Sequence, residues 1–313
     1  MTRKIIIDCD PGIDDAIALG MALFDPRLEV LAITAVAGTV DADQATNNVT
    51  SIVTMLDPPR YPRIGKATPG EDAPVGDDSF LHGSDGLAEC HFEPSGRQRQ
   101  QPSEKVLSDL IEQYPNEISI VCLGPLTNLA RLIRWEPNLV PLIDQVIISG
   151  GTVHHPGNAT PVAERNFYFD PKSAATVFAS ATTKTLVPLD VTEEVRFGVE
   201  ILEQLPSAGT HMGSLLRKIL PFAFRAAHQK LGEELIPLYD PTSLMAILEP
   251  DLFSWEPMAG KVETVGELTR GMTLFDQRLR RNWPMNLEVA CEVDADEVRD
   301  AIIRSMRYAG QKS

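Results

Sequence analysis

The chain has 313 residues, with 28 Lys and Arg against 44 Asp and Glu, so its formal net charge is −16. Hydrophobic residues make up 43%, which is ordinary globular usage and excludes a disordered or fibrous chain. The acidity argues against nucleic acid or an anionic membrane as a partner, because both attract basic protein surfaces.

The cysteines and the N-terminal segment indicate the compartment. The four cysteines are scattered and form no Cys-x-x-Cys pair, which is typical of reduced thiols and argues against a disulfide framework or a zinc site. The first apolar run, residues 5–7, is too short for the core of a signal peptide, and no run approaches the length of a membrane span. The sequence therefore predicts a soluble, cytoplasmic protein.

Strand-like apolar runs alternate with helix-like segments along the chain. The expected strands are residues 4–7, 30–36, 118–123, 145–149, 185–189 and 287–293. The expected helices are residues 14–24, 41–56 (with Asp41 or Asp43 near the cap), 103–114 (with Ser103 as N-cap), 126–135, 171–180, 219–231, 241–248 and 296–306. Continuous apolar strands between helices predict an α/β fold, with an open, mostly parallel sheet, helices on both faces and a Rossmann-like core.

Two further features concern the organisation of the chain. Residues 66–101 are rich in Pro, Gly, Asp and Ser, which predicts a long functional loop. No break in composition and no internal repeat divides the sequence, so we expect a single catalytic domain over residues 1–313.

Four carboxylates are crowded into the eight residues that follow the first expected strand, with a Pro-Gly turn between them: Asp8, Asp10, Asp14 and Asp15. Helix capping would account for one or two of them. Four at the end of a buried strand would repel one another unless a cation lay among them. Because all the donors are hard oxygens, the pattern predicts a Ca²⁺ or Mg²⁺ site.

The string DCDPGIDDAIAL (residues 8–19) resembles the N-terminal signature of the inosine-uridine-preferring nucleoside hydrolases, Ca²⁺-dependent enzymes that cleave N-ribosyl bonds. The resemblance continues in family order through VAGT (36–39), HGSDGLAE (82–89), LGPLTNLA (123–130), ISGG (148–151), GNATPVAERNFYFDP (157–171) and YDP (239–241). These blocks span most of the chain, and the family's fold, an open domain with a mostly parallel sheet, agrees with the expected strands and helices.

The resemblance implies a metal centre and a reaction. Asp10, Asp15 and Asp240 would ligate Ca²⁺ with their carboxylates, and Leu123 would add its backbone carbonyl. The 2′- and 3′-hydroxyls of a ribonucleoside and one water would complete the ligand shell. The metal would lower the pKa of that water, and Asp10 would take its proton as general base. Attack on the anomeric carbon through an oxocarbenium-like transition state would give ribose and free base.

The same resemblance assigns residues to the substrate. Asp14 and Asn166 would hold the sugar hydroxyls, while Asn158 and Glu164 would reach the 5′-hydroxyl. Asp8 would support the metal ligands. Taken singly, the last three substrate residues also fit an ordinary polar loop, but their place within GNATPVAERN favours the binding role.

Three positions depart from the family pattern: Thr39 replaces an asparagine and Ser149 a methionine, both expected near the substrate, and Tyr239 replaces the histidine that can protonate the leaving base. A tyrosine with an ordinary pKa near 10 is a poorer acid at neutral pH than a histidine near 6.5. Either Tyr239 donates the proton directly or another group, such as His82 or His228, takes over. His228 also fits a solvated helix position. We therefore expect an altered base preference.

Two other functions remain open at this point. Asp8-Cys9-Asp10 also fits the strand-end motif of haloacid-dehalogenase-type phosphatases, although the Pro-Gly-x-Asp-Asp continuation does not. A catalytically weak protein that binds nucleoside or ribose would also explain the three departures. The family resemblance further suggests a homo-oligomer, either a dimer or a tetramer, while the sequence does not identify the base or establish that the natural substrate is a ribonucleoside.

Overall fold

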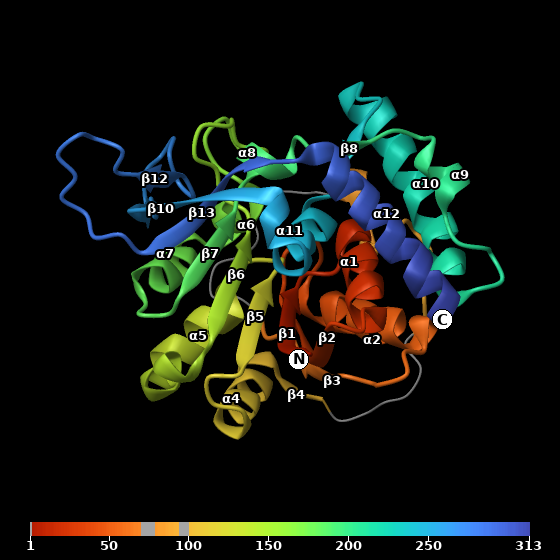
Figure 1. Ribbon diagram of the computed structural model, residues 1–313, viewed down its shortest axis with the longest axis horizontal. Coiled ribbons are helices and arrows are strands. Elements are labelled where there is room, and N and C mark those ends of the chain that lie inside the picture. The colour runs from red at the N-terminus through yellow and green to blue at the C-terminus, as the bar shows by residue number, and fades with distance from the viewer. Residues whose placement is uncertain (1, 70–78, 94–99) are drawn as a thin grey trace.

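The structure is a computed structural model that describes residues 2–69, 79–93 and 100–313. A nine-stranded sheet runs through it in the order β10-β13-β7-β6-β5-β1-β2-β3-β4 (Figure 1). Neighbouring strands are parallel except for the antiparallel pair β10–β13. The strands are β1 (Arg3–Cys9), β2 (Leu28–Ala35), β3 (Arg63–Lys66), β4 (Gln101–Pro102), β5 (Ile118–Cys122), β6 (Gln145–Ser149), β7 (Lys184–Val187), β10 (Phe253–Met258) and β13 (Leu287–Val293).

Helices cover both faces of this sheet. They are α1 (Ile13–Phe24), α2 (Ala42–Leu56), α3 (Ser79–His82), α4 (Ser103–Gln113), α5 (Thr127–Trp135), α6 (Arg165–Phe169), α7 (Pro171–Ala179), α8 (Leu189–Thr192), α9 (Ile201–Gln204), α10 (His211–Leu231), α11 (Tyr239–Leu248) and α12 (Ala295–Lys312), with the 3₁₀ helices η1 (Pro137–Leu142) and η2 (Pro250–Leu252). On one face α5 packs against α4 and α7, and on the other α1 packs against α2, α10, α11 and α12 (Figure 1). The predicted fold class is confirmed.

Two small two-stranded sheets lie outside the main one. One pairs β8 (Arg196–Phe197) with β9 (Ile236–Pro237), and the other pairs β11 (Gly260–Val262) with β12 (Thr273–Phe275); both are antiparallel. The first of these sheets brings the segment after α8 next to the segment that leads into α11.

The strands are apolar throughout because the sheet is buried on both faces. In β1, Ile5 and Ile7 point into the core beneath α1, whereas Ile6, between them, joins the core beneath α4 and α5. Successive side chains on a strand point to opposite faces, so a strand between two helical layers needs apolar residues at every position. This is why the strands appear in the sequence as continuous apolar runs.

The predicted elements agree with most of the observed ones, with one cap wrong. Asp41 caps α2 as predicted, with its side chain accepting a hydrogen bond from the Gln44 N–H. Ser103 is not the N-cap of α4: that position is Pro102, and the Ser103 hydroxyl donates instead to the carbonyl of Ala35 at 2.8 Å. The helix expected over residues 219–231 begins earlier, at His211.

The outer strands β3, β4 and β10 escaped the sequence analysis because they are short or carry exposed charged and proline residues. Of the predicted loop at residues 66–101, residues 70–78 and 94–99 lie outside the described residues. The part between them contains the short helix α3 followed by a series of turns.

The strand order reverses direction between β1 and β5, at the centre of the sheet. From β1 the chain moves outward through β2 to β3, and from β5 it moves the opposite way through β6 to β7. Ligands of open α/β sheets bind where the strand order reverses in this way. Asp10 follows β1, Thr39 follows β2 and Leu123 follows β5, so the predicted site residues meet at this point.

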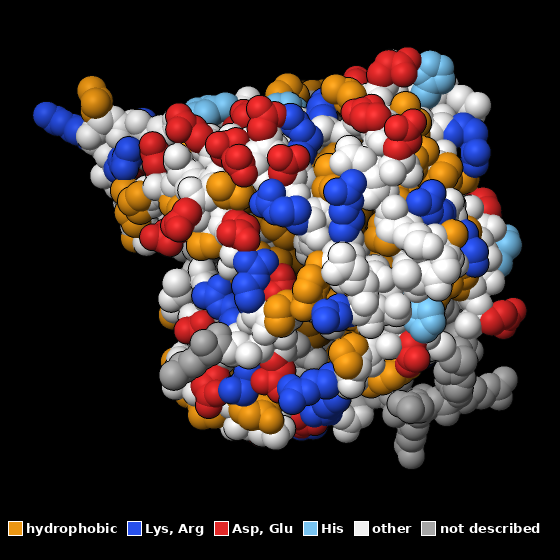
Figure 2. Space-filling view, turned by 45° about the vertical axis from the view of Figure 1, so that its right-hand side comes forward, with side chains coloured by type: hydrophobic (Ala, Val, Ile, Leu, Met, Phe, Trp, Pro, Cys, Tyr) orange, Lys and Arg blue, Asp and Glu red, His pale blue; other side chains and the backbone are white. Residues whose placement is uncertain are grey.

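The charge of the surface and the polarity of the helices are as the acidic, moderately hydrophobic composition predicts. On the face shown in Figure 2, acidic side chains are interspersed with basic ones, and the described residues there form no broad basic surface. Among the described residues, no helix combines the length and apolar character that crossing a membrane requires.

Candidate active site

Asp10 lies in a tight cradle just beyond β1. Its carboxylate is buried, and Oδ2 accepts hydrogen bonds from the Thr39 backbone N–H at 2.7 Å and from the Thr39 hydroxyl at 3.0 Å. Gly38 and Gly124 close in on either side, and a Cβ atom added at either position would overlap the Asp10 carboxylate. Both glycines are therefore required for the close approach of the backbone to this side chain.

Three other carboxylates converge beside Asp10. Asp14 and Asp15 lie in the first turn of α1 and Asp240 in the first turn of α11, and one ligand oxygen from each lies within 4.8 Å of the other two. Asp15 accepts a hydrogen bond from the Gly12 N–H through Oδ2 at 2.9 Å, while its buried Oδ1 has no hydrogen-bond partner among the described residues. An unpartnered buried oxygen inside a cluster of carboxylates suits a bound cation.

Burial and mutual repulsion raise the pKa values of the carboxylates in this group. Burial, followed by the charge of Asp14, raises the pKa of Asp15 to about 7. Burial and the neighbouring carboxylates also raise the pKa of Asp240. The pKa of Asp10 is raised by burial and by Asp15, against the hydrogen bonds from Thr39. Without a positive ion, these carboxylates favour protonation; a divalent cation would favour their ionised forms.

Of the predicted metal ligands, the structure brings Asp15 and Asp240 together, and it adds Asp14, which the resemblance assigned to the sugar. Asp10 lies close enough to raise the pKa of Asp240. The carbonyl of Leu123 accepts a hydrogen bond from the Asn166 side chain at 2.8 Å, so the predicted carbonyl ligand and a predicted sugar contact are direct neighbours.

The side chains of Glu164 and Ser149 accept hydrogen bonds from other groups of the protein. Glu164 caps α6, and its carboxylate accepts backbone N–H groups from Gly151, Asn166 and Phe167 at 3.0, 3.0 and 3.2 Å. Burial raises the pKa of Glu164, against these hydrogen bonds. The Ser149 hydroxyl accepts from Ser243 on α11 at 2.9 Å.

The Tyr239 hydroxyl is directed at a residue that the sequence analysis did not identify. It donates to Oε1 of Glu193 at 2.7 Å, and Oε2 of Glu193 pairs with Arg196, also at 2.7 Å. Burial and then Glu193 raise the pKa of Tyr239, against a hydrogen bond from the Asn158 side chain. Two features argue against Tyr239 as the acid that protonates the leaving base: its pKa is raised, and its hydroxyl proton is already donated to Glu193.

The two histidine candidates lie in different surroundings. His82 ends α3, with Nδ1 accepting from the Ile13 N–H at 3.1 Å and lying 4.0 Å from Oδ1 of Asp14. His228 lies near the end of α10, where 63% of its side chain is exposed and Nδ1 pairs with Glu234 at 3.0 Å. The described contacts favour the solvated position for His228, and the predicted substrate contact finds no support in them.

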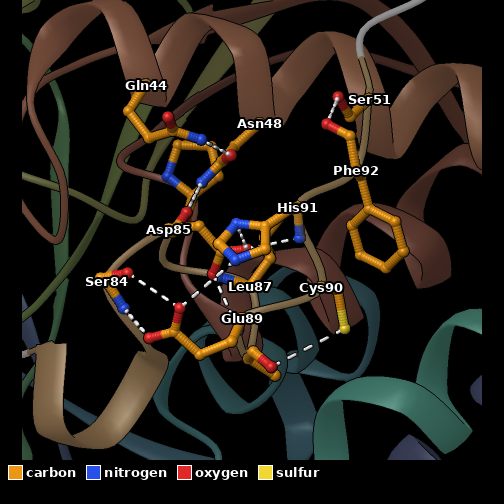
Figure 3. Close-up of polar contacts among 12 residues, drawn as sticks. Gln44, Asn48, Ser51, Ser84, Asp85, Leu87, Glu89, Cys90, His91 and Phe92 are labelled. Atoms are coloured by element: carbon orange, nitrogen blue, oxygen red, sulfur yellow. Dashed lines mark hydrogen bonds and ion pairs between the residues drawn. The ribbon is translucent and has the colours of Figure 1, made fainter.

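The loop after His82 is organised by Asp85 (Figure 3). Its buried carboxylate accepts the backbone N–H groups of Leu87, Glu89 and His91 at 2.8, 2.9 and 2.7 Å. Both Glu89 and His91 have positive φ angles, 58° and 47°, which side-chain-bearing residues rarely adopt. The Asp85 hydrogen bonds therefore hold a strained backbone path that begins at His82.

One more residue of this site, Asn48 on α2, was missed by the sequence analysis. It donates to the Asp85 carbonyl (Figure 3) and to the carbonyl of Pro11, which joins the loop to the turn before α1. Asp8, expected to support the metal ligands, accepts from Thr34 and from Asn128 through Oδ1, and so joins β1, β2 and α5. Burial raises the pKa of Asp8 to about 7.

Comparison with known proteins agrees with this geometry. A model of the family described as inosine-uridine preferring nucleoside hydrolase matches residues 5–300. The chain is 35% identical to uridine nucleosidase 1 of Arabidopsis thaliana, over 89% of this chain and 83% of the relative. It is 31% identical to the inosine-uridine preferring nucleoside hydrolase of Leishmania major, over 99% of each chain.

The chain belongs to the inosine-uridine preferring nucleoside hydrolase family. A solved plant nucleoside hydrolase, the PpNRh1 enzyme, superposes with a TM-score of 0.92 at 29% identity, covering 98% of this chain and 99% of that one. The fold is shared as well by a purine-preferring ribonucleoside hydrolase from Gardnerella vaginalis, at a TM-score of 0.91 and 24% identity. The protein is therefore a nucleoside hydrolase.

The glycine cradle of this nucleoside hydrolase gives a first prediction. Gly124→Ala should displace the Asp10 carboxylate and lower kcat/KM for a ribonucleoside about 100-fold, since misplacement of a reacting group by about 1 Å costs that much. Gly209→Ala is the matched control, because its Cβ would meet only the Ser207 hydroxyl at 3.7 Å. Equal activity of the two variants in a ribose-release assay would contradict the cradle.

The Asp85 loop gives a second prediction. Asp85→Ala removes the acceptor of three backbone N–H groups, so the free energy of unfolding should fall by about 2–3 kcal/mol. Turnover should fall as well, because the loop places His82. Urea denaturation and kcat measure the two effects. Asp300→Ala on the exposed surface of α12 is the control, and a loss of stability there of similar size would refute the assignment.

Proposed function

We propose that this nucleoside hydrolase cleaves the N-glycosidic bond of ribonucleosides in a Ca²⁺-dependent reaction, with Asp10 as the general base, to give ribose and the free base. The observation that carries the proposal is the cluster of Asp14, Asp15 and Asp240, in which a buried carboxylate oxygen of Asp15 lacks a hydrogen-bond partner among the described residues. A member of this family with such a cluster has both the fold and the donor set for metal-assisted ribosyl chemistry.

Ca²⁺ is the proposed ion because every donor is a hard oxygen and Ca²⁺ accepts many such ligands in flexible geometry. Asp10, Asp15 and Asp240 would hold it with their carboxylates, and Leu123 with its backbone carbonyl. When bound, the ion would ligate the 2′- and 3′-hydroxyls of the ribose and make a water molecule more acidic.

The protein's own groups would carry the proton and hold the sugar. Asp10 would accept a proton from the attacking water, with one carboxylate oxygen fixed by Thr39. Asp14 and Asn166 would hold the ring hydroxyls as the anomeric carbon flattens and gains positive charge. Glu164 can still accept the 5′-hydroxyl, because Oε1 receives one backbone N–H and keeps a second lone pair.

The leaving base needs a proton source, and we propose His82 for that role. It lies beside Asp14, accepts the Ile13 N–H through Nδ1 and has Nη1 of Arg165 at 3.4 Å from its Nε2. Tyr239 would alter the base preference without donating the proton. The relatives are named after different bases, as uridine nucleosidase and as pyrimidine-specific and inosine-uridine preferring hydrolases, so membership of the family does not fix that preference.

The remaining expectations stand as proposals: one catalytic domain over residues 1–313, a cytoplasmic location, and a homo-oligomer, either a dimer or a tetramer. The continuous nine-stranded sheet, whose strands come from residues 3 to 293, supports the first. The match to the nucleoside hydrolase family over residues 5–300 disfavours the haloacid-dehalogenase alternative, and a purely binding role becomes an outcome of the test below.

The test is the release of free ribose from a panel of purine and pyrimidine ribonucleosides, with added Ca²⁺ and with a chelator. Ribose release that stops in chelator and returns with Ca²⁺ is the expected result, and the panel identifies the preferred base. Full activity in chelator would rule out the metal. Nucleoside binding with no release from any member of the panel would favour the binding role.

Replacement of the proposed base gives a further prediction. Asp10→Asn should lower kcat at least about 100-fold, because proton transfer to a positioned carboxylate contributes that much to such reactions. The exposed Asp43→Asn on α2 is the control. Turnover within a few-fold of the wild type would contradict the assignment of Asp10.

The same variant should be more stable than the wild type in chelator. The folded-state pKa of Asp10 is raised above the ordinary value near 3.9, so the wild-type protein loses stability as the pH rises and this carboxyl ionises. Asn carries no charge, and the gain in thermal midpoint should therefore be small near pH 5 and larger near pH 8. A gain that shrinks with rising pH would contradict the cost assigned to the Asp10 charge.

A further inference from the structure

One carboxylate binds three consecutive residues of the loop that follows β6. Asp190, in the first turn of α8, accepts the Val153 N–H through Oδ2 at 2.7 Å. Its Oδ1 accepts the N–H groups of His154 and His155 at 2.7 and 3.1 Å. Hydrogen bonds from backbone N–H groups to a carboxylate are among the stronger ones in proteins, so these contacts fix this part of the loop on α8.

The same loop is joined to the residues that are expected at the substrate. Near its start, the Gly151 N–H donates to Oε2 of Glu164 at 3.0 Å. Asn158 follows three residues after the last N–H that Asp190 binds. Its Oδ1 accepts the backbone N–H of Arg165, the first residue of α6, at 2.9 Å. The loop therefore connects Asp190 with both residues expected at the 5′-hydroxyl of the ribose.

Other contacts fix the start of this loop. The Leu189 N–H, also on α8, donates to the Gly151 carbonyl at 3.0 Å. The Thr152 N–H donates to the hydroxyl of Thr273 on β12 at 2.9 Å. The first two residues of this part are thus bound to neighbouring elements, and Asp190 supplies the contacts farther along the chain.

Space beside the loop would allow it to move. A hollow of about 330 Å³ is lined by Val153, His154 and Asp190, together with Met258 of β10 and Phe275 of β12. Close packing on all sides can keep a loop in place without specific contacts, but an open space cannot. The three hydrogen bonds to Asp190 hold the loop at the edge of this hollow.

We propose that Asp190 is a positioning residue for the reaction. By binding residues 153–155 to α8, it keeps Asn158 and Glu164 where they meet the 5′-hydroxyl of the substrate. Asp190 acts through the loop and not by contact with the substrate. The inference rests on the proposed function, which gives Asn158 and Glu164 the contact with that hydroxyl.

A positioning role and a general structural role predict different losses on two substrates. If Asp190 acts through the contacts with the 5′-hydroxyl, its removal matters when the substrate carries that hydroxyl and matters little when the substrate lacks it. A general structural defect lowers the activity on both substrates alike. The preferred ribonucleoside and its 5′-deoxy analogue therefore separate the two roles.

The experiment measures kcat/KM for these two substrates. Asp190→Ala should lose about tenfold on the ribonucleoside, the equivalent of one hydrogen bond, and should lie within about twofold of the wild type on the 5′-deoxy analogue. Asp190→Asn keeps an oxygen that can still accept the N–H groups of His154 and His155, and it should show the same pattern with a smaller loss. An equal loss on both substrates, or no loss on either, would overturn the inference.

A double variant tests the route through the loop. Because Asp190 and Asn158 act on the same contact, Asp190→Ala combined with Asn158→Ala should lose less on the ribonucleoside than the product of the two single losses. Single losses that simply multiply would overturn the inference. The matched control is Glu194→Ala, which removes an exposed carboxylate close to α8 and should match the wild type on both substrates.

Failure of the proposed function would give a different result. If the wild-type protein releases sugar from neither substrate, the proposed reaction is wrong and the inference falls with it. If Asn158→Ala loses no more on the ribonucleoside than on the 5′-deoxy analogue, the proposed contact of Asn158 is wrong, and the inference again falls. If only the Asp190 variants depart from the expected pattern, the inference alone is wrong. Thermal midpoints measured with added Ca²⁺ show that each variant is folded during the assay.

Discussion

Mutual repulsion among buried carboxylates is the constraint on which the rest of this structure depends. Asp10, Asp14, Asp15 and Asp240 are packed where the central strands end, and burial adds to the cost of the negative charges on Asp10, Asp15 and Asp240. Hydrogen bonds from the Gly12 backbone N–H to Asp15 and from Thr39 to Asp10 offset part of this cost. Such an arrangement is poor for stability alone, and in the proposed function its value would lie in holding an ion and a sugar.

The parts of the fold set by repeated pattern could be predicted from the sequence. Strand β6 and helix α2 follow from continuous apolar runs, helix formers and the Asp41 cap. Ser103 shows the limit of such reasoning, because a serine at the start of a helix has the composition of a cap whether or not its hydroxyl is drawn to a strand carbonyl elsewhere. The edge strands failed for a related reason, since strands that are exposed on one side need no continuous apolar run.

The candidate site divides along similar lines. Its carboxylates could be located because four acidic residues at the end of one buried strand would repel one another, which suggested a functional role. The family blocks added Asp240 to them. The partners Glu193 and Asn128 could not be found in this way, since each contacts residues far away in the chain through only one or two hydrogen bonds. Of the two alternatives for His228, the contacts favour the solvated one, because its side chain is exposed near the end of α10.

The order in which the chain supplies the site has a consequence for synthesis. The carboxylates come from residue 10 at one extreme and residue 240 at the other, and the first turn of α11 must dock on α1 before they meet. During translation, the full carboxylate cluster cannot form until more than three quarters of the polypeptide has left the ribosome. An ion that binds only the completed cluster would then stabilise the fully synthesised chain and would not stabilise a truncated one.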